Sequence, residues 1–408
     1  MTASPNRVGL TRPVEIQVVL LTGGFDKPYV LGLAKALVSR EVYLDIIGSD
    51  GVDSPELHDT PKLNFLNLQG AQSRRGTANK LMSVLIYYAR LIHYVSIAKP
   101  KLFHILWNNK LQLLDRTFLM LYYKLRGKKI VFTAHNVNAG IRDSNDSWHN
   151  RLTLRIQYRL ADRIFVHTKK MKRELVATFG VSEGAVSVIP FGINNAVPVT
   201  DLTPNEAKQR LGIGSDEKTI LFFGNIGPYK GLEYLVAAFQ LLASTNTGYR
   251  LIIAGKVRGG SEKYFQEIQR TIAGDVSREW VRQRIEYIPD EDTELYFKGA
   301  DLLVLPYTHI SQSGVLFLGF SFGLPVVATD VGSLGDDIVE GRTGFLCKPC
   351  DPAQLAHTIE TYFESDLFRK LDNWRQEIRA YTSATHSWDA VAEATCAVYA
   401  ELLMREIS

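Results

Sequence analysis

The sequence predicts an α/β protein built from two doubly wound domains, each with a largely parallel sheet covered by helices. A chain of 408 residues exceeds what one hydrophobic core usually holds, so two cores are expected. Short apolar runs without alternation recur between helical patterns, which is typical of strands covered on both faces. A turn-rich segment at residues 192–203 divides these runs into two series and indicates a linker.

Eleven strands are predicted, six before the linker and five after it. The first series is IQVVLLT (16–22), YLDII (43–47), LFHIL (102–106), KIVFTA (129–134), RIFVHT (163–168) and VSVIP (186–190). The second series is TILFFG (219–224), RLIIAG (250–255), RIEYIP (284–289), DLLVLP (301–306) and PVVAT (325–329). A helix should begin at Thr203 and Pro204. This pattern gives domain limits of 1–191 and 204–384.

Composition and cysteine content indicate an ordered protein of the cytoplasm. The chain is 46% hydrophobic and 22% charged, which is ordinary for a globular protein. The three cysteines fit neither a disulfide framework nor a four-ligand zinc site, so a reducing compartment is expected. They are Cys347, Cys350 and Cys396. The first 20 residues contain no apolar segment of the kind found in secretory signals.

The charge is distributed unevenly along the chain. Residues 1–195 hold 27 Lys and Arg against 14 Asp and Glu, whereas the remainder holds 20 against 29. Such polarity predicts that the first half meets an anionic surface, although a simple solvated excess of charge would give the same count.

Two basic and apolar segments, residues 73–101 and 116–129, favour contact with a membrane surface. The apolar stretch at 81–98 is interrupted by Arg90 and His93, so it is a poor spanning helix. A helix lying on anionic lipid fits better. A core helix whose basic residues face water remains the alternative. The basic side chains expected to meet lipid are Arg74, Arg75 and Lys80.

Polar and glycine-rich turns follow the strands of the second domain and predict an anion site. Gly224 and Gly227 let the backbone approach a ligand, and Lys230, expected on an exposed loop at a helix start, offers a point charge to phosphate. Lys256 and Arg258 follow the next strand. Each turn alone could be an ordinary surface loop, but together they should converge.

A third turn, after the strand that ends at Pro306, opens an apolar helix whose first amides could receive an anion. The residues expected to contribute are Ser311, Gln312, Ser313, Gly314 and Val315.

These segments resemble the family 4 retaining glycosyltransferases of the GT-B fold. The second-domain motifs are LFFGNIGPYKG (221–231), GLPVVATDVGS (323–333) and GRTGFL (341–346). The other similar segments are KIVFTAHNVNAG (129–140), ADRIFVHT (161–168), VSVIPFGI (186–193) and SATHSWDAVAEATCAVYAELL (383–403). The resemblance implies an acceptor domain at 1–191, a nucleotide-sugar domain at 204–384 and a helix at 385–408 that returns to the first domain.

The resemblance also implies an activity and a location. A sugar would move from a nucleoside diphosphate sugar, with UDP favoured over GDP, to an acceptor such as a lipid-linked or polysaccharide precursor of cell-surface glycans. The enzyme would need no cofactor and would work in the cytoplasm or on the inner face of the membrane. Nucleic acid is not an expected partner.

The sequence departs from the family pattern at three positions. Members usually carry two glutamates with seven residues between them in this region, and here the aligned positions hold Ile310 and Leu318. The family's arginine in the glycine-rich turn is replaced by Asn225. The chain is therefore a variant without the two-glutamate motif.

The reaction expected from the resemblance can be stated in physical terms. Charge grows on the departing diphosphate, and Lys230 with the helix amides, Asn225 and Lys256 would stabilise that charge without a metal. The departing phosphate oxygen would serve as the base for the acceptor hydroxyl. His135, at a strand end of the first domain, would position the acceptor or the donor sugar, and Gly23 and Gly24 would face the acceptor.

Two other functions remain open from the sequence. One is a sugar-nucleotide epimerase of the same architecture, although its usual carboxylates are not apparent in the matching motifs. The other is a catalytically silent subunit that binds a nucleotide sugar, which the missing glutamates favour.

Overall fold

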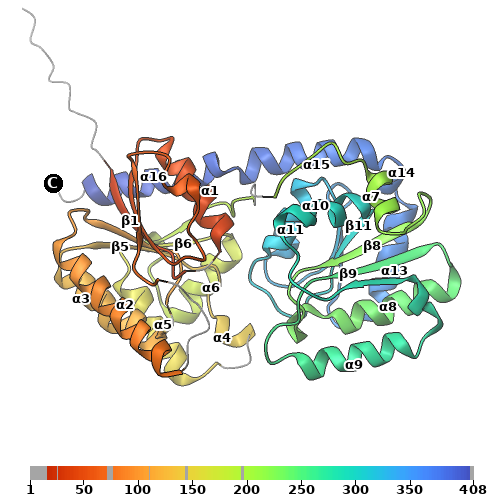
Figure 1. Ribbon diagram of the computed structural model, residues 1–408, viewed down its shortest axis with the longest axis horizontal. Helices are drawn as coiled ribbons and strands as arrows, with labels where there is room; N and C mark the ends of the chain where they lie inside the picture. The colour runs from red at the N-terminus through yellow and green to blue at the C-terminus, as the bar shows by residue number, and fades with distance from the viewer. Residues whose placement is uncertain are drawn as a thin grey trace, which may run out of the picture. The chain divides into compact units, whose positions relative to one another are not determined.

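A computed structural model describes residues 16–24, 26–70, 77–109, 111–142, 146–193 and 197–404, and it contains two parallel β-sheets with flanking helices (Figure 1). The first sheet has seven strands in the order β3-β2-β1-β4-β5-β6-β7, and the second has six in the order β10-β9-β8-β11-β12-β13. The expected doubly wound α/β architecture is confirmed.

The first sheet uses residues 17–188. Its strands are β1 (Gln17–Leu21), β2 (Tyr43–Gly48), β3 (Leu63–Asn67), β4 (Leu102–Ile105), β5 (Lys129–Thr133), β6 (Arg163–Val166) and β7 (Val186–Val188). The helices in this part of the chain are α1 (Lys27–Val38), α2 (Thr77–Ile97), α3 (Met120–Leu125), α4 (Ala139–Arg142), α5 (Trp148–Leu160) and α6 (Lys169–Phe179). Shorter turns are the 3₁₀ segments η1 (Pro55–Leu57) and η3 (Glu183–Ala185) and the π-helix η2 (Leu114–Leu119).

The second sheet uses residues 218–347. Its strands are β8 (Lys218–Phe223), β9 (Tyr249–Ala254), β10 (Val281–Arg284), β11 (Leu302–Leu305), β12 (Val326–Thr329) and β13 (Gly344–Cys347). The associated helices are α7 (Pro204–Arg210), α8 (Leu232–Thr245), α9 (Glu262–Ala273), α10 (Asp290–Gly299), α11 (Gly314–Ser321), α12 (Leu334–Asp337), α13 (Pro352–Glu364), α14 (Asp366–Arg369) and α15 (Leu371–His386), with 3₁₀ turns η4 (Pro228–Lys230) and η5 (Val276–Trp280). The chain ends with α16 (Trp388–Met404).

The strands that the sequence missed are edge strands. β3 and β13 were not predicted, and the strand expected at 284–289 is wrong, because β10 ends at Arg284. β10 has the sequence VRQR, and all four of its residues retain solvent exposure. An edge strand pairs on one side only and need not be covered on both faces, so it lacks the continuous apolar run that marks a central strand.

By contact density the chain divides into two compact units, residues 1–131 with 392–408 and residues 132–391. In the first unit, α16 contacts the rest of the unit through side chains. The Tyr399 hydroxyl lies 2.5 Å from Nδ1 of His104, and Arg40 lies 3.3 Å from Glu393. These two contacts join the last helix to the first part of the chain.

The start of α7 agrees with the sequence pattern. Thr203 is its N-cap, Pro204 follows, and Glu206 completes a capping box by accepting from the backbone N–H of Thr203. No helix among the described residues combines the length and apolarity needed to cross a bilayer.

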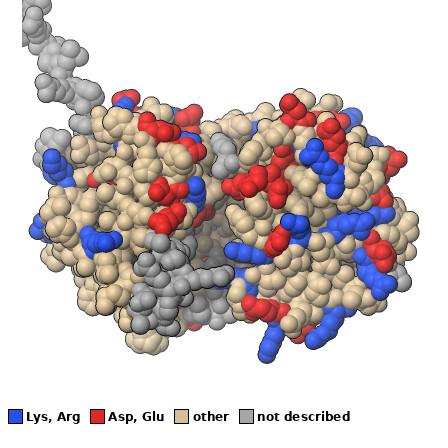
Figure 2. All heavy atoms as spheres, in the orientation of Figure 1, with Lys and Arg blue, Asp and Glu red and all other residues tan. Residues whose placement is uncertain are grey.

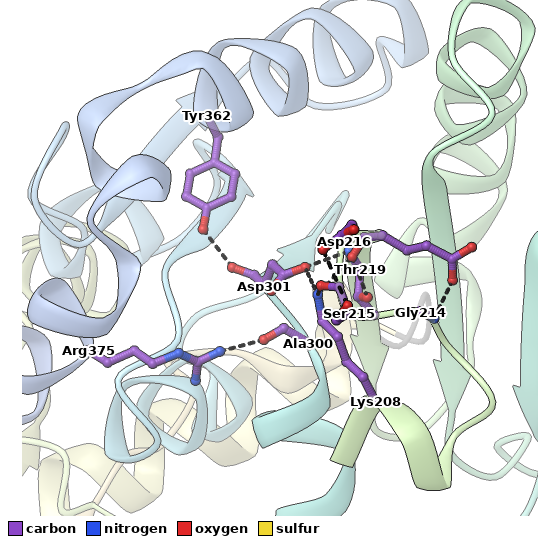
Figure 3. Close-up of polar contacts among 10 residues, drawn as sticks. Lys208, Gly214, Ser215, Asp216, Thr219, Ala300, Asp301, Tyr362 and Arg375 are labelled. Atoms are coloured by element: carbon purple, nitrogen blue, oxygen red, sulfur yellow. Dashed lines mark hydrogen bonds and ion pairs between the residues drawn. The ribbon is translucent and has the colours of Figure 1, made fainter. Parts of the chain in front are cut away.

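A buried polar cluster joins the helices of the second sheet to the amino ends of its strands (Figure 3). Lys208 Nζ on α7 lies 2.8 Å from Oδ2 of Asp301, and the same oxygen accepts from the backbone N–H of Thr219 at 2.8 Å. Tyr362 on α13 donates to the backbone carbonyl of Asp301, and Arg375 on α15 donates to the carbonyl of Ala300. Lys208 and Asp301 are almost fully buried. The cluster therefore ties three helices to β8 and β11.

Replacing Lys208 with methionine should destabilise the protein, because the Asp301 carboxylate would stay buried without its cation. Breaking a buried pair in this way costs about 3 kcal/mol or more. The measurement is chemical denaturation. Lys370→Met is the control, because Lys370 pairs with Asp366 at the exposed surface and its loss should cost less than about 1 kcal/mol. Equal midpoints for the two variants would contradict the structural role of the cluster.

Candidate functional site

The loops after β8 and β9 touch through their backbones. Gly255 has a φ of +148°, and a Cβ on it would lie 2.0 Å from the carbonyl oxygen of Gly224. The loops are also joined by a hydrogen bond from the N–H of Ile226 to the carbonyl of Lys256, at 2.8 Å. Only glycine permits so close an approach. The two predicted turns therefore do converge.

The loop after β11 joins them on the other side. Gly231 has a φ of +62°, and a Cβ there would lie 2.0 Å from the carbonyl oxygen of Pro306. The N–H of Thr308 donates to the carbonyl of Tyr229 at 2.9 Å. The segment from Gly224 to Lys230 is thus held between the loops after β9 and β11, at the carboxyl edge of the sheet, where doubly wound domains bind ligands.

Lys230 is buried at the centre of this arrangement, with a relative exposure of 6%. The expectation of an exposed loop lysine was therefore wrong. Its Nζ lies 2.5 Å from the hydroxyl of Tyr307 and 4.0 Å from the centre of that ring. It also lies 5.6 Å from the ring of Tyr229. Burial raises the pKa of Tyr307, so the phenol stays neutral. Two aromatic rings and a hydroxyl therefore fix the ammonium group.

The amino end of α11 lies beside this lysine. The Ser313 hydroxyl is 3.4 Å from that of Tyr307, which in turn contacts Lys230. Ser313 occupies the N-cap position without a capping hydrogen bond from its side chain, and the first turn contains no acidic residue. A Cβ on Gly224 would lie 3.3 Å from the side chain of Val315. Amides of a first helical turn have no partner within the helix, so they can bind an anion.

Ser311 and Gln312 are fastened to the loop after β12. Both the N–H and the hydroxyl of Ser333 donate to the carbonyl of Ser311, at 3.1 and 2.6 Å. The Gln312 side chain accepts from Ser333 and donates to Asp337 at 3.0 Å. Burial raises the pKa of Asp337 to about 7. The Gln312 side chain therefore holds the turn in place.

The remaining predicted residues of this domain differ in their exposure to solvent. Asn225 and Lys256 are exposed, and Lys256 Nζ is 5.6 Å from the ring of Tyr287. The Arg258 guanidinium lies 5.7 Å from the Tyr229 ring that Lys230 also contacts. Gly227 is buried and precedes η4.

Several residues that the sequence analysis did not select are part of the site. They are Tyr229, Tyr307, Ser333 and Asp337. Tyr307 comes directly after the strand end at Pro306, and this position was the available signal.

His135 follows β5 and lies against a second histidine. Its Nδ1 is 3.1 Å from Nε2 of His167, which follows β6. Burial lowers the pKa of His167 to about 4, so that ring is neutral near pH 7. Phe191 contacts the His167 ring at 4.9 Å and stacks at 5.4 Å on Phe317 of α11. His135 belongs to the same compact unit as the loops after β8, β9 and β11.

A cavity of about 330 Å³ lies within this unit. Its lining includes Asn138, Lys170, Glu174, His309 and Ser311. The volume is near the lower end, roughly 300 Å³, for sites that hold small molecules. Burial raises the pKa of Glu174, while the nearby lysine and histidine act in the opposite direction.

The positions that align with the two family glutamates differ in environment. Ile310 lines the cavity, whereas Leu318 is buried in the core of the second sheet. The chain's one Asp-x-Asp triplet, residues 290–292, forms the first turn of α10, where carboxylates complement the helix dipole. Among the described residues, no three His, Cys, Asp or Glu side chains gather as metal ligands.

Gly23 and Gly24 follow β1 in the other compact unit. Both have positive φ, and a Cβ on Gly24 would lie 2.5 Å from Oε1 of Gln69, while one on Gly23 would lie 2.8 Å from the carbonyl of Asn108. They form a tight turn at the carboxyl edge of the first sheet, where the sequence predicted a loop. Their role toward an acceptor stays a prediction.

Two family models match parts of the chain. A family model described as Glycosyltransferase Family 4 matches residues 28–197, and one described as Glycosyl transferases group 1 matches residues 217–365. Glycosyltransferase models therefore match both halves of the chain, and its two parallel-sheet α/β domains have the GT-B fold.

Its relatives by sequence include a D-inositol 3-phosphate glycosyltransferase of Corynebacterium efficiens, 28% identical over 68% of this chain. The match spans 66% of that relative, slightly less than two thirds of its length. An uncharacterised glycosyltransferase of Methanocaldococcus jannaschii is 26% identical over 58% of this chain and 59% of its own.

Solved structures share this fold. Anabaena HepE in complex with UDP aligns with a TM-score of 0.72 and 15% identity over 95% of this chain and all of that one. Sucrose-phosphate synthase from Thermosynechococcus elongatus aligns with a TM-score of 0.75 and 19% identity over 96% of this chain and all of that one.

Asp337→Asn should change how stability depends on pH. The folded-state pKa of about 7 lies above the ordinary aspartate pKa of 3.8, so this group favours the folded state at low pH and that contribution is lost as pH rises through 7. As pH rises from 5.5 to 8, the stability of the variant should therefore increase relative to that of the wild type, by on the order of 1 kcal/mol. Thermal melts at both pH values provide the measurement. Asp216→Asn, at an exposed site, is the control for the loss of one carboxylate.

Proposed function

We propose that the protein is a metal-independent, retaining glycosyltransferase that takes a sugar from a nucleoside diphosphate sugar. A UDP-sugar is favoured over a GDP-sugar. The observation that carries the proposal is the buried Lys230, fixed by Tyr307 beside the amino end of α11. The HepE structure was solved with UDP and with UDP-glucose, which supports a uridine donor for a chain of this fold.

The arrangement suits a departing diphosphate. Negative charge grows on the phosphate oxygen as the bond to the sugar breaks, and preorganised cations and amides stabilise that charge more than they stabilise the ground state. Lys230 would supply the cation and the first turn of α11 the amides. Because the lysine is held in a poorly solvated place, little reorganisation is needed when the charge develops.

The transfer step would proceed on one face of the sugar. The acceptor hydroxyl forms a bond to the anomeric carbon on the side from which the diphosphate leaves, and its proton passes to the departing phosphate oxygen. The cavity beside Ser311 would hold the sugar, with His135 positioning it or the acceptor. The acceptor proposed is a lipid-linked or polysaccharide precursor of a cell-surface glycan, met at the cytoplasmic face of the membrane.

One assay separates this function from its alternatives. The protein is incubated with labelled nucleotide sugars and a membrane extract. Transfer of label to lipid or polysaccharide supports the proposal. Isomerised donor would indicate an epimerase, and tight donor binding without turnover would indicate a silent binding subunit.

Donor choice can be tested before any acceptor is known. Calorimetric titration should show UDP binding at least about tenfold more tightly than GDP, a difference of roughly 1.4 kcal/mol. The comparison uses the same protein preparation with each diphosphate. Tighter binding of GDP would reverse the donor assignment while leaving the diphosphate site in place.

Lys230→Met should lower kcat by on the order of 10²-fold, about 3 kcal/mol, with a smaller loss of UDP affinity. Arginine should rescue only in part, because its planar fork does not reproduce a compact ammonium. Lys218→Met is the matched control, since Lys218 lies at the opposite end of β8 against the rings of Tyr249 and Phe363.

A thermal melt accompanies each variant, because Lys230 is buried and its loss could affect folding. Tyr307→Phe provides a second route, since it keeps the charge and removes the hydroxyl that fixes it. If Lys230→Met melts normally and transfers sugar at the wild-type rate, the placement of the active site is wrong.

A further inference from the structure

The first compact unit carries an exposed apolar surface on two neighbouring helical segments. We call it the α2–α3 surface and define it by Leu81, Leu85 and Ile86 of α2 with Phe118, Leu121 and Leu125 of η2 and α3. Their exposures range from 43% to 84%. Of the 21 large hydrophobic side chains exposed among the described residues, 11 lie between residues 81 and 125. Such concentration marks an interaction surface rather than scattered surface residues.

The two segments lie side by side (Figure 1). The Tyr122 hydroxyl donates to the carbonyl of Ile92, and Arg126 donates to the carbonyl of Ser96 at 2.6 Å. Other side chains of α2 face the core, with Leu91 and Val95 at 0% and 1% exposure. The helix therefore already has its own core-facing side, and the apolar surface is an additional one.

The charged residues in this part of the chain are almost all basic. Residues 61–142 contain 14 Lys and Arg and a single acidic residue, Asp115, which is buried. Arg90, Lys99 and Lys101 are exposed within or just after α2. In the view of Figure 2, the area over α2 and α3 consists mainly of uncharged atoms with scattered Lys and Arg.

Three basic residues that the sequence predicted to meet lipid cannot be placed on this surface. Arg74 and Arg75 lie outside the described residues, as does the side chain of Lys80.

We infer that the α2–α3 surface lies on an anionic lipid bilayer, with its apolar side chains at the acyl boundary and its basic side chains among the headgroups. A second copy of the chain fits less well, because a two-fold interface would bring the same basic rim against itself. The inference rests on the proposed function. Binding to the bilayer would hold the enzyme where a lipid-linked acceptor is found.

The test is flotation of the protein with vesicles of phosphatidylcholine alone or of phosphatidylcholine mixed with anionic phosphatidylglycerol. Binding should require the anionic lipid and weaken as salt rises. The variant Leu85→Ser/Phe118→Ser/Leu125→Ser should bind about tenfold more weakly or worse. Arg90→Gln/Lys99→Gln/Lys101→Gln should reduce binding to anionic vesicles and flatten the salt dependence.

The matched control is Val199→Ser/Leu241→Ser/Tyr381→Ser, which removes exposed apolar side chains from the other compact unit. It should bind vesicles as the wild type does. UDP titration and a thermal melt are run on every variant. Retained UDP binding shows that the donor domain is intact, so a failure here is distinct from a failure of the proposed function.

Two results would overturn the inference. One is equal recovery of the wild type and the apolar triple variant with anionic vesicles. The other is a wild type that forms a dimer in solution, ignores vesicles and becomes monomeric in the triple variant, which would identify a second copy as the occupant.

Discussion

Close backbone contact between the loops of the second sheet is the constraint on which the candidate site depends. Parallel strands deliver their following loops to one edge of the sheet, but direction alone does not bring those loops together. Contact requires that Gly255 and Gly231 carry no side chain, since a Cβ on either would overlap a neighbouring carbonyl oxygen. Once the loops meet, Lys230 is held under the rings of Tyr229 and Tyr307 and beside the start of α11.

The two edges of the same sheet serve different purposes. At the amino edge, Lys208 and Asp301 form a buried pair that fastens α7 to β8 and β11. At the carboxyl edge, Lys230 contacts a phenol and aromatic rings where we propose that the diphosphate binds. Under that proposal, stability and anion binding can be changed separately by mutation.

In the first unit, the basic residues and the exposed apolar residues lie in the same part of the chain. The excess of Lys and Arg is greatest where the exposed apolar residues of α2 and α3 also lie. Apolar and basic side chains on one surface combine the two forces that hold a peripheral protein on anionic lipid, namely burial of apolar area and attraction to headgroups. Neither the charge nor the exposed leucines would carry that conclusion alone.

The sequence by itself determined the fold class, the central strands and the turns that converge on the site. These followed from continuous apolar runs, as in β8 and β11, and from glycines and a lysine at strand ends. Edge strands such as β10 were not predicted, because a strand that pairs on one side only need not have a continuous apolar run. Only the tertiary structure decided that Lys230 is buried and that Gln312 turns toward Asp337, since both depend on partners 77 and 25 residues away that no local pattern specifies.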